Sequence, residues 1–177
     1  DQKMSILAEY GRGDVIIIAI ENGSEDRIKE YVLDHNSITE NAEGKKYLRF
    51  LADTLKPYVD SVYRTKPERE FTGIGGSSLG GLISIYSGFL YPEVYSKLMI
   101  FSPSLWINPE NNFPQMNFKN PYDIKVYMYG GEKEGSEMTE RIHLFEETME
   151  GWEHSLSLQF TFKISIMMLE IFTHIKP

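Results

Sequence analysis

The chain has 177 residues, 41% of them hydrophobic and 25% charged, with a formal net charge of −8, and this length suits one domain with a single core. The excess of 26 acidic over 18 basic residues argues against nucleic acid or an anionic membrane as a partner. The sequence holds no cysteine, which excludes disulfides, thiolate zinc sites and cysteine nucleophiles. No apolar run reaches the ~18 residues of a membrane span and no signal-peptide pattern opens the chain, so we predict a cytoplasmic location.

The first part of the chain predicts a strand, a loop and a helix. Val15–Ile20 is a continuous, β-branched run, typical of a parallel strand that is buried on both faces. Residues 21–42 are polar and predict a long loop. From about Glu43 to Tyr63 the apolar residues recur every three or four positions, which predicts an amphipathic helix, kinked or restarted at Pro57.

The middle of the chain alternates between strands and helices. Arg69–Gly76 predicts a strand that runs into glycines, and Leu79–Tyr91 predicts a helix that ends before Pro92. Lys97–Phe101 and Ile124–Gly130 predict two further short strands. This alternation indicates a mainly parallel α/β sheet.

The remaining segments complete a single domain over residues 1–177. Residues 102–123 contain four prolines and predict an extended surface loop or lid. Ser136–Glu150 predicts a helix with Gly151 near its C-terminal cap. Leu156–Ile166 alternates strictly between apolar and polar residues, which indicates a half-exposed strand near the edge of the sheet.

One motif carries chemistry: Gly76-Ser77-Ser78-Leu79-Gly80 matches G-x-S-x-G and lies between a predicted strand and a predicted helix. In that context the pattern predicts a sharp turn that exposes the Ser78 hydroxyl as a nucleophile, with glycines where side chains would collide. The backbone N–H of Leu79 would lie at a helix N-terminus and stabilise an oxyanion. The alternative is a glycine-rich turn without chemistry. A phosphate-binding loop is excluded because Leu82 stands where that motif needs lysine.

A serine nucleophile needs an acid and a base, and in α/β-hydrolases these come after it in the order acid, then histidine. The acid is predicted in the loop after Ile124–Gly130, where Glu134 is preferred to Glu132. The alternative is that these glutamates form a solvated helix entrance, favoured by the helix dipole.

The base is less well defined by the sequence. His174 lies after the last predicted strand and is preferred; His154, which is predicted just after the helix, and no functional histidine are the alternatives. His143 is predicted on the helix surface and His35 lies out of order, upstream of Ser78. The four histidines lack H-E-x-x-H spacing, so neither a metal site nor a cofactor is predicted.

Several spaced segments resemble the putative esterases of the esterase D type, within the α/β-hydrolases. That group includes siderophore, feruloyl and acetyl-xylan esterases and S-formylglutathione hydrolases, and the likeness over residues 12–150 is greatest to the siderophore (enterochelin) esterase-like branch. The segments that carry the likeness are Glu21-Asn22-Gly23, Glu30-Tyr31, Phe50-Leu51, Leu55–Asp60, Tyr63-Arg64-Thr65, Gly73–Gly81, Tyr91-Pro92 and Phe101–Trp106.

The resemblance implies an α/β-hydrolase fold with a mainly parallel sheet flanked by helices. It implies Ser78 as nucleophile, Leu79 as oxyanion donor and Glu134 as triad acid. Ser102–Trp106 would line the active-site mouth, with Trp106 as its aromatic wall. Family members begin earlier and end on a histidine loop and a closing helix. We therefore expect a chain truncated at both ends, which lacks the first strands and the closing helix.

Two functions are expected on these grounds, and a remoter third is a domain that binds an acidic ligand at the glycine-rich turn without chemistry. The first is a serine esterase, a carboxylic-ester hydrolase that acts through an acyl-enzyme on a small or siderophore-like ester, so that its partner is a small-molecule substrate. The second is a catalytically inactive or fragmentary hydrolase domain. The sequence determines neither the particular ester nor the oligomeric state.

Overall fold

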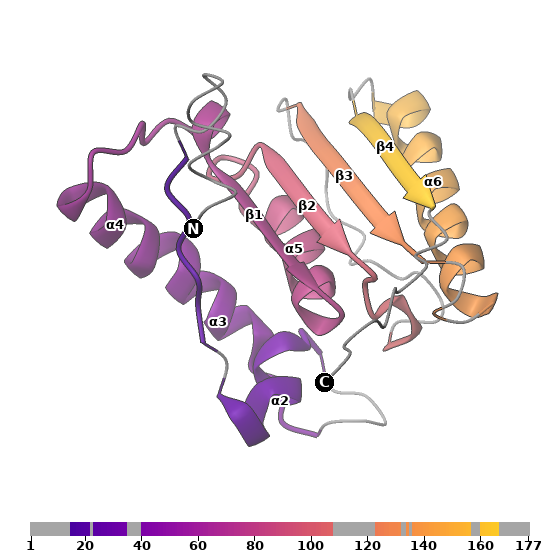
Figure 1. Cartoon of the computed structure of the whole chain (residues 1–177), viewed down its shortest axis with the longest axis horizontal. Helices are drawn as coiled ribbons and strands as arrows, with labels where there is room; N and C mark the ends of the chain where they lie inside the picture. The colour runs from indigo at the N-terminus through magenta and orange to yellow at the C-terminus, as the bar shows by residue number, and fades with distance from the viewer. Residues whose placement is uncertain are drawn as a thin grey trace, which may run out of the picture.

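The computed structural model describes residues 15–21, 23–34, 40–107, 123–131, 134, 136–156 and 160–166. Within them, four strands form one parallel sheet in the order β1-β2-β3-β4 (Figure 1). The strands are β1 (Gly73–Ser77), β2 (Lys97–Phe101), β3 (Ile124–Gly130) and β4 (Phe160–Ile166). The predicted parallel α/β sheet is thus confirmed, and β2 and β3 have the predicted bounds.

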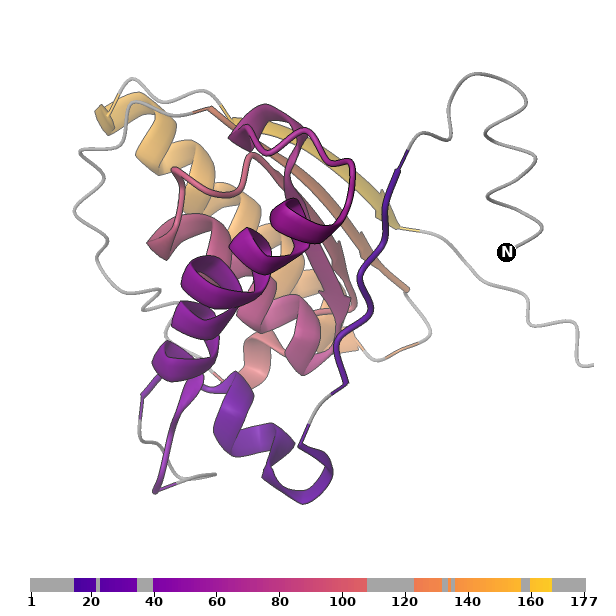
Figure 2. The ribbon, with the colours of Figure 1, turned by 90° about the vertical axis from the view of Figure 1, so that its left-hand side faces the viewer.

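Two long helices cover one face of this sheet. The helix α5 (Leu79–Leu90) connects β1 to β2 and packs on both, whereas α6 (Ser136–Leu156) connects β3 to β4 and packs on those two strands. Figure 2 shows both helices on the same side of the sheet. The shorter helices α2 (Arg27–Tyr31), α3 (Gly44–Phe50) and α4 (Lys56–Val62) precede β1, and α2 and α3 contact α5.

The core lies between the sheet and these helices. Successive side chains of a strand point to opposite faces, so every second residue of β2 and β3 enters the core. Leu98 and Ile100 of β2 are at most 1% exposed and join one buried cluster with residues of α5 and α6. The other cluster members from β3, α5 and α6 include Val126, Met128, Leu82, Ile85, Ile142 and Phe145.

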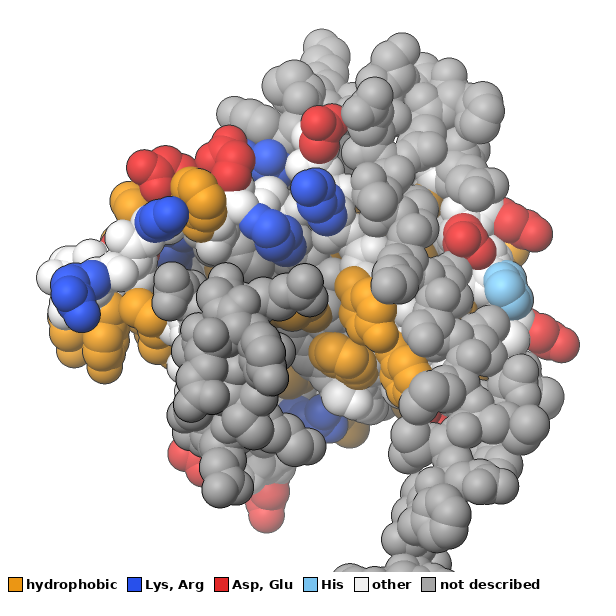
Figure 3. All heavy atoms as spheres, turned by 45° about the horizontal axis from the view of Figure 1, so that its top comes forward, with side chains coloured by type: hydrophobic (Ala, Val, Ile, Leu, Met, Phe, Trp, Pro, Cys, Tyr) orange, Lys and Arg blue, Asp and Glu red, His pale blue; other side chains and the backbone are white. Residues whose placement is uncertain are grey.

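The opposite face of β2 is open among the described residues. Met99 is 47% exposed and Phe101 is 41% exposed. The Phe101 ring lies 6.0 Å from that of Tyr127 and 6.4 Å from that of Tyr129, between ring centroids. Figure 3 shows hydrophobic side chains reaching the surface of this side of the molecule, with lysine or arginine side chains nearby.

The predicted strand Val15–Ile20 is wrong. Residues 15–21 are described without helix or strand, and the five large side chains of this run are 40% or more exposed. A strand exists only where a neighbour completes its hydrogen bonds, and this segment pairs with none of the described strands. Figure 1 draws this segment, in indigo, without a strand arrow. β-branched composition alone therefore misled the prediction.

The long amphipathic helix around Pro57 is confirmed, including its restart. Between α3 and α4 lies a π-helical turn, Leu51–Leu55, in which the Lys56 N–H donates to the carbonyl of Leu51, five residues back. Pro57 falls in the first turn of α4. Proline has no N–H and its ring crowds the carbonyl four residues earlier, so a wider turn just before it relieves the strain.

Three other boundaries differ from the prediction. The predicted loop 21–42 contains α2, whose Tyr31 stacks on Tyr47 of α3 with ring centroids 5.0 Å apart. The strand predicted over Arg69–Gly76 is β1, shifted to Gly73–Ser77 behind a 3-10 turn. Gly151 is not a cap, because α6 continues to Leu156; a glycine costs only about 1 kcal/mol inside a helix, too little to end this one.

The last strand agrees with its predicted place. β4 pairs with β3 and lies at the edge of the described sheet. It begins at Phe160 rather than Leu156, because Leu156 belongs to α6. In the part of the chain that is described, no helix combines the length and the apolar character that crossing a bilayer requires.

Candidate active site

Ser78 lies at the sharp turn that the motif predicts. β1 ends at Ser77 and α5 begins at Leu79, and Ser78 between them has φ 58° and ψ −120°. This backbone conformation is strained for a residue with a side chain, and such strain persists where the surroundings hold it. Here the Ser78 N–H donates to the carbonyl of Phe101 at 3.0 Å, and its own carbonyl accepts from the N–H of Leu82 at 3.1 Å. The Ser78 residue remains exposed.

The two glycines of the motif have different roles. A Cβ on Gly76 would lie 2.6 Å from the carbonyl carbon of Gly80, a backbone atom that cannot move aside, so the close approach of strand and helix requires glycine there. A Cβ on Gly80 would meet no atom within 4 Å. Steric need therefore explains the first glycine but not the second, contrary to the expectation that both avoid a collision.

A second serine contacts the candidate nucleophile. The hydroxyl oxygens of Ser78 and Ser104 are 2.9 Å apart, and the Ser104 N–H donates to the Ser78 carbonyl at 3.1 Å. Ser104 is only 3% exposed. The family resemblance placed Ser104 in the active-site mouth but did not predict this contact, since 26 residues separate the two serines. The signal available was that two neighbouring parallel strands each end in a serine-bearing segment.

Glu134 lies where the sequence placed it, in the loop after β3. Its N–H donates to the carbonyl of Gly131 at 3.0 Å, and its carboxylate Oε1 accepts from the Gly131 N–H at 3.2 Å. The side chain is exposed. Ser78 and Glu134 thus come after two strands whose carboxyl ends meet at one edge of the sheet, but no hydrogen bond joins them. As a triad acid, Glu134 stays a prediction.

The predicted base is not placed by the structure. His174, His35 and Glu132 lie outside the described residues. His154 falls in the last turn of α6 rather than after the helix. The His143 side chain is half exposed, and its Nδ1 lies 3.5 Å from a carboxylate oxygen of Glu146, so it is a surface residue as predicted.

The two other predicted site residues flank the turn differently. Leu79 is the first residue of α5 and its side chain is buried; its N–H lies at the helix N-terminus, where the backbone dipoles favour negative charge. Trp106 lies in a 3-10 turn, Leu105–Ile107, and is 51% exposed. Among the described residues no cluster of histidine, aspartate and glutamate has the arrangement of a metal site.

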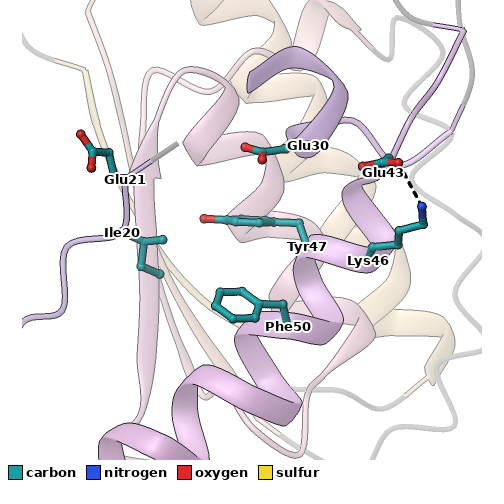
Figure 4. A pocket seen from close by; sticks show the side chains of 7 residues that line it. All are labelled: Ile20, Glu21, Glu30, Glu43, Lys46, Tyr47 and Phe50. Carbon is teal, nitrogen blue, oxygen red and sulfur yellow. Dashed lines mark hydrogen bonds and ion pairs between the residues drawn. The ribbon is translucent and has the colours of Figure 1, made fainter. Parts of the chain in front are cut away.

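A hollow of about 350 Å³ lies apart from these residues, between the segment that holds Ile20 and the helices α2 and α3 (Figure 4). None of the predicted site residues lines it. Its Glu43 carboxylate bonds the Lys46 ammonium at 3.0 Å, and Glu30 accepts from the Gly23 N–H at 2.9 Å. Burial and the hydrogen bond to Tyr31 raise the pKa of Tyr47 well above its usual range, so its phenol stays neutral. The charged groups of this hollow are thus largely satisfied within the chain.

A parallel sheet with helices on its face, and a serine at a strained strand-to-helix turn above its carboxyl edge, define the α/β-hydrolase class of fold. The sequence pattern of the Putative esterase family matches residues 2–155. The chain therefore belongs to that family.

One curated protein is similar to this chain in sequence. The uncharacterized protein YbbA of Bacillus subtilis (strain 168) is 27% identical over 130 residues, which are 70% of this chain and 51% of YbbA. The chain thus spans about half the length of the curated relative it matches.

Solved structures show the same fold. The BES protein from Bacillus cereus superposes with a TM-score of 0.65 at 20% identity, over 92% of this chain and 67% of that one. An IroE-like serine hydrolase from Shewanella oneidensis superposes with a TM-score of 0.62 at 16% identity, over 79% of this chain and 50% of that one. The siderophore hydrolase EstB from Aspergillus nidulans superposes with a TM-score of 0.55 at 20% identity, over 72% of this chain and 52% of that one.

Proposed function

We propose that this chain carries the nucleophile of a serine esterase, a carboxylic-ester hydrolase, with Ser78 as the attacking residue. The observation that supports this most directly is the strained turn at Ser78, an exposed residue directly before the N-terminus of α5. Membership of the Putative esterase family supports the same reaction. A strained backbone conformation lowers the stability of the fold, and such conformations are found mainly at functional sites, where the reaction needs the geometry.

The proposed reaction has two balanced steps. Ser78 Oγ attacks the ester carbonyl carbon while the base takes its proton, and the oxyanion that forms is stabilised by the Leu79 N–H. The bond to the alcohol oxygen then breaks, and the alcohol leaves with the proton from the base. Water adds to the acyl-enzyme in the same way and releases the acid and free Ser78. In this scheme Glu134 orients the base, and His174 is the preferred base with His154 as the alternative.

The substrate proposed is a small or siderophore-like ester. EstB is a siderophore hydrolase by its name, and an esterase from Shigella flexneri with the same fold acts on enterobactin by its name. Trp106, half exposed in the 3-10 turn that directly follows Ser104, is proposed to offer an aromatic surface to the acyl group.

Labelling with a fluorophosphonate probe tests the nucleophile. The parent chain should be labelled, Ser78→Ala should lose the label, and Ser77→Ala should keep it, since Ser77 is the adjacent exposed serine and a matched control. Labelling that survives in Ser78→Ala would show that another residue reacts. Loss of label in His174→Ala or in His154→Ala would identify the base, and a slower reaction in Glu134→Gln would support its role as acid.

A non-catalytic hydrolase domain is the second candidate, and the open face of β2 is the observation that favours it. Met99 and Phe101 are both more than 40% exposed on that face, which resembles a binding surface more than a solvent-facing one. A chain that unfolds cooperatively but is never labelled would favour this candidate over the esterase.

A further inference from the structure

Ser104 contacts Ser78 through two separate groups. Its backbone N–H donates to the Ser78 carbonyl at 3.1 Å, and its hydroxyl oxygen lies 2.9 Å from the Ser78 hydroxyl oxygen. The first contact holds the backbone of the turn, and the second reaches the candidate reacting atom. A serine-to-alanine change at position 104 removes only the second, so the two contributions can be separated by experiment.

The proposed reaction determines the direction of the hydroxyl contact. Each hydroxyl has one proton to donate and two lone pairs to accept with. Ser78 must give its proton to a base, whereas Ser104 is 3% exposed and offers its proton from the protein interior. If Ser78 donated to Ser104, its proton would point into the core and away from any base on the exposed side. The productive arrangement is therefore donation from Ser104 to Ser78.

We propose that Ser104 is a positioning residue for Ser78, an inference that rests on the proposed esterase function. Its hydroxyl donates to Ser78 Oγ, which fixes the side-chain rotamer of Ser78 and leaves the Ser78 proton directed toward the base. The same donor stabilises the negative charge that grows on Ser78 Oγ as the proton leaves, because hydrogen bonds to charged oxygen are stronger than those to neutral oxygen.

The site that holds this donor is rigid. Ser104 comes directly after Pro103, and a Cβ added to Gly81 of α5 would lie 3.2 Å from Pro103 Cα, so the segment packs tightly on the helix. The next residue, Leu105, is 1% exposed and belongs to the core cluster. A donor held by the core loses little conformational entropy when it makes its hydrogen bond, which suits a positioning role.

The kinetic test compares Ser104→Ala with Ser84→Ala. Ser84 is also buried, at 1% exposure, but its hydroxyl donates to the Gly80 carbonyl at 2.7 Å and does not reach Ser78. With p-nitrophenyl acetate, Ser104→Ala should lower kcat about 10- to 100-fold with KM little changed, and slow fluorophosphonate labelling equally. Ser84→Ala should leave both rates near the parent, and Ser104→Thr, which keeps a hydroxyl, should recover most of the loss. Equal rates in the two alanine variants, or a change in KM alone, would overturn the proposal.

A thermal-stability cycle tests the contact without any need for activity. Melting temperatures are measured for the parent, Ser78→Ala, Ser104→Ala and the double variant. If the two hydroxyls are bonded, the two single drops should sum to about 2–4 °C more than the drop of the double variant. Strictly additive drops would overturn the positioning role even if Ser78 is labelled. A coupled pair in a chain that is never labelled would instead refute the proposed function and leave the contact established.

Discussion

The ends of β1 and β2 use the same backbone device for different purposes. Ser78 after β1 has φ 58° and donates its N–H to Phe101, and Ser102 after β2 has φ 42° and donates its N–H to the carbonyl of Tyr129 at 2.7 Å. Each serine thus adds one more hydrogen bond to the next strand and then turns the chain with a positive φ.

The segment after each turn decides where the serine hydroxyl lies. After Ser78 the chain enters α5 at once, so the side chain stays exposed above a helix N-terminus. After Ser102 it continues through Pro103 into a 3-10 turn, and the next serine, Ser104, is carried into the interior. At the end of β1 the serine with positive φ, Ser78, is itself exposed. At the end of β2 the serine with positive φ, Ser102, is followed two residues later by the buried Ser104, whose hydroxyl contacts that of Ser78.

The largest expected effect at the end of β1 comes from adding a side chain at Gly76. Gly76→Ala places a Cβ 2.6 Å from a backbone atom of Gly80, so we expect a loss of about 3 kcal/mol in the free energy of unfolding. Gly80→Ala is the matched control: it meets open space within a helix and should gain up to about 1 kcal/mol. Urea unfolding of both variants measures the pair. Equal stabilities would show that the close approach of β1 and α5 does not constrain Gly76.

A smaller effect tests the strain at Ser78 itself. Ser78→Gly and Ser78→Ala both remove the hydroxyl, but only glycine adopts φ 58° together with ψ −120° without strain. We expect the glycine variant to be more stable by about 1 kcal/mol, after the entropy that glycine loses on folding. Thermal unfolding should show this as a melting temperature about 2–4 °C higher. A glycine variant no more stable than the alanine variant would mean that the turn is relaxed.

The smallest expected effect is at the second strand end. Ser102 has a φ of 42°, and a positive φ alone favours glycine over serine by only about 0.5 kcal/mol once the entropy of glycine is counted, so Ser102→Gly should gain that much. Ser102→Ala keeps the Cβ and should show no gain. Differential scanning calorimetry on the two variants resolves the difference. If Ser102→Gly gained as much stability over Ser102→Ala as Ser78→Gly gains over Ser78→Ala, the backbone at the two strand ends would be equally strained, contrary to this expectation.

The sequence predicted the structure correctly where the local pattern of residues agrees with the tertiary packing. β2 and β3 have their predicted bounds because short apolar runs between turn residues are typical of strands in the interior of a sheet. Ser78 was found at its turn because the close approach of strand and helix requires the first glycine of the motif, Gly76.

Other features depend on contacts that no local pattern encodes. Val15–Ile20 has strand composition, but a strand forms only with a partner, and composition does not supply one. The bond between Ser78 and Ser104 requires that β1 and β2 be neighbours in register, which the sequence of either segment does not state. The end of α6 was misplaced because one glycine is a weaker signal than the rest of a long helix.

The π-helical turn Leu51–Leu55 has a consequence for how this segment can change in evolution. A turn of this kind absorbs one inserted residue while the helices on either side keep their faces in phase. Pro57, just beyond it, is tolerated because the wide turn relaxes the carbonyls that its ring would crowd. A one-residue deletion within the turn would restore a regular helix and confront it with Pro57. We therefore expect a one-residue deletion in this turn to destabilise the chain unless Pro57 is replaced at the same time.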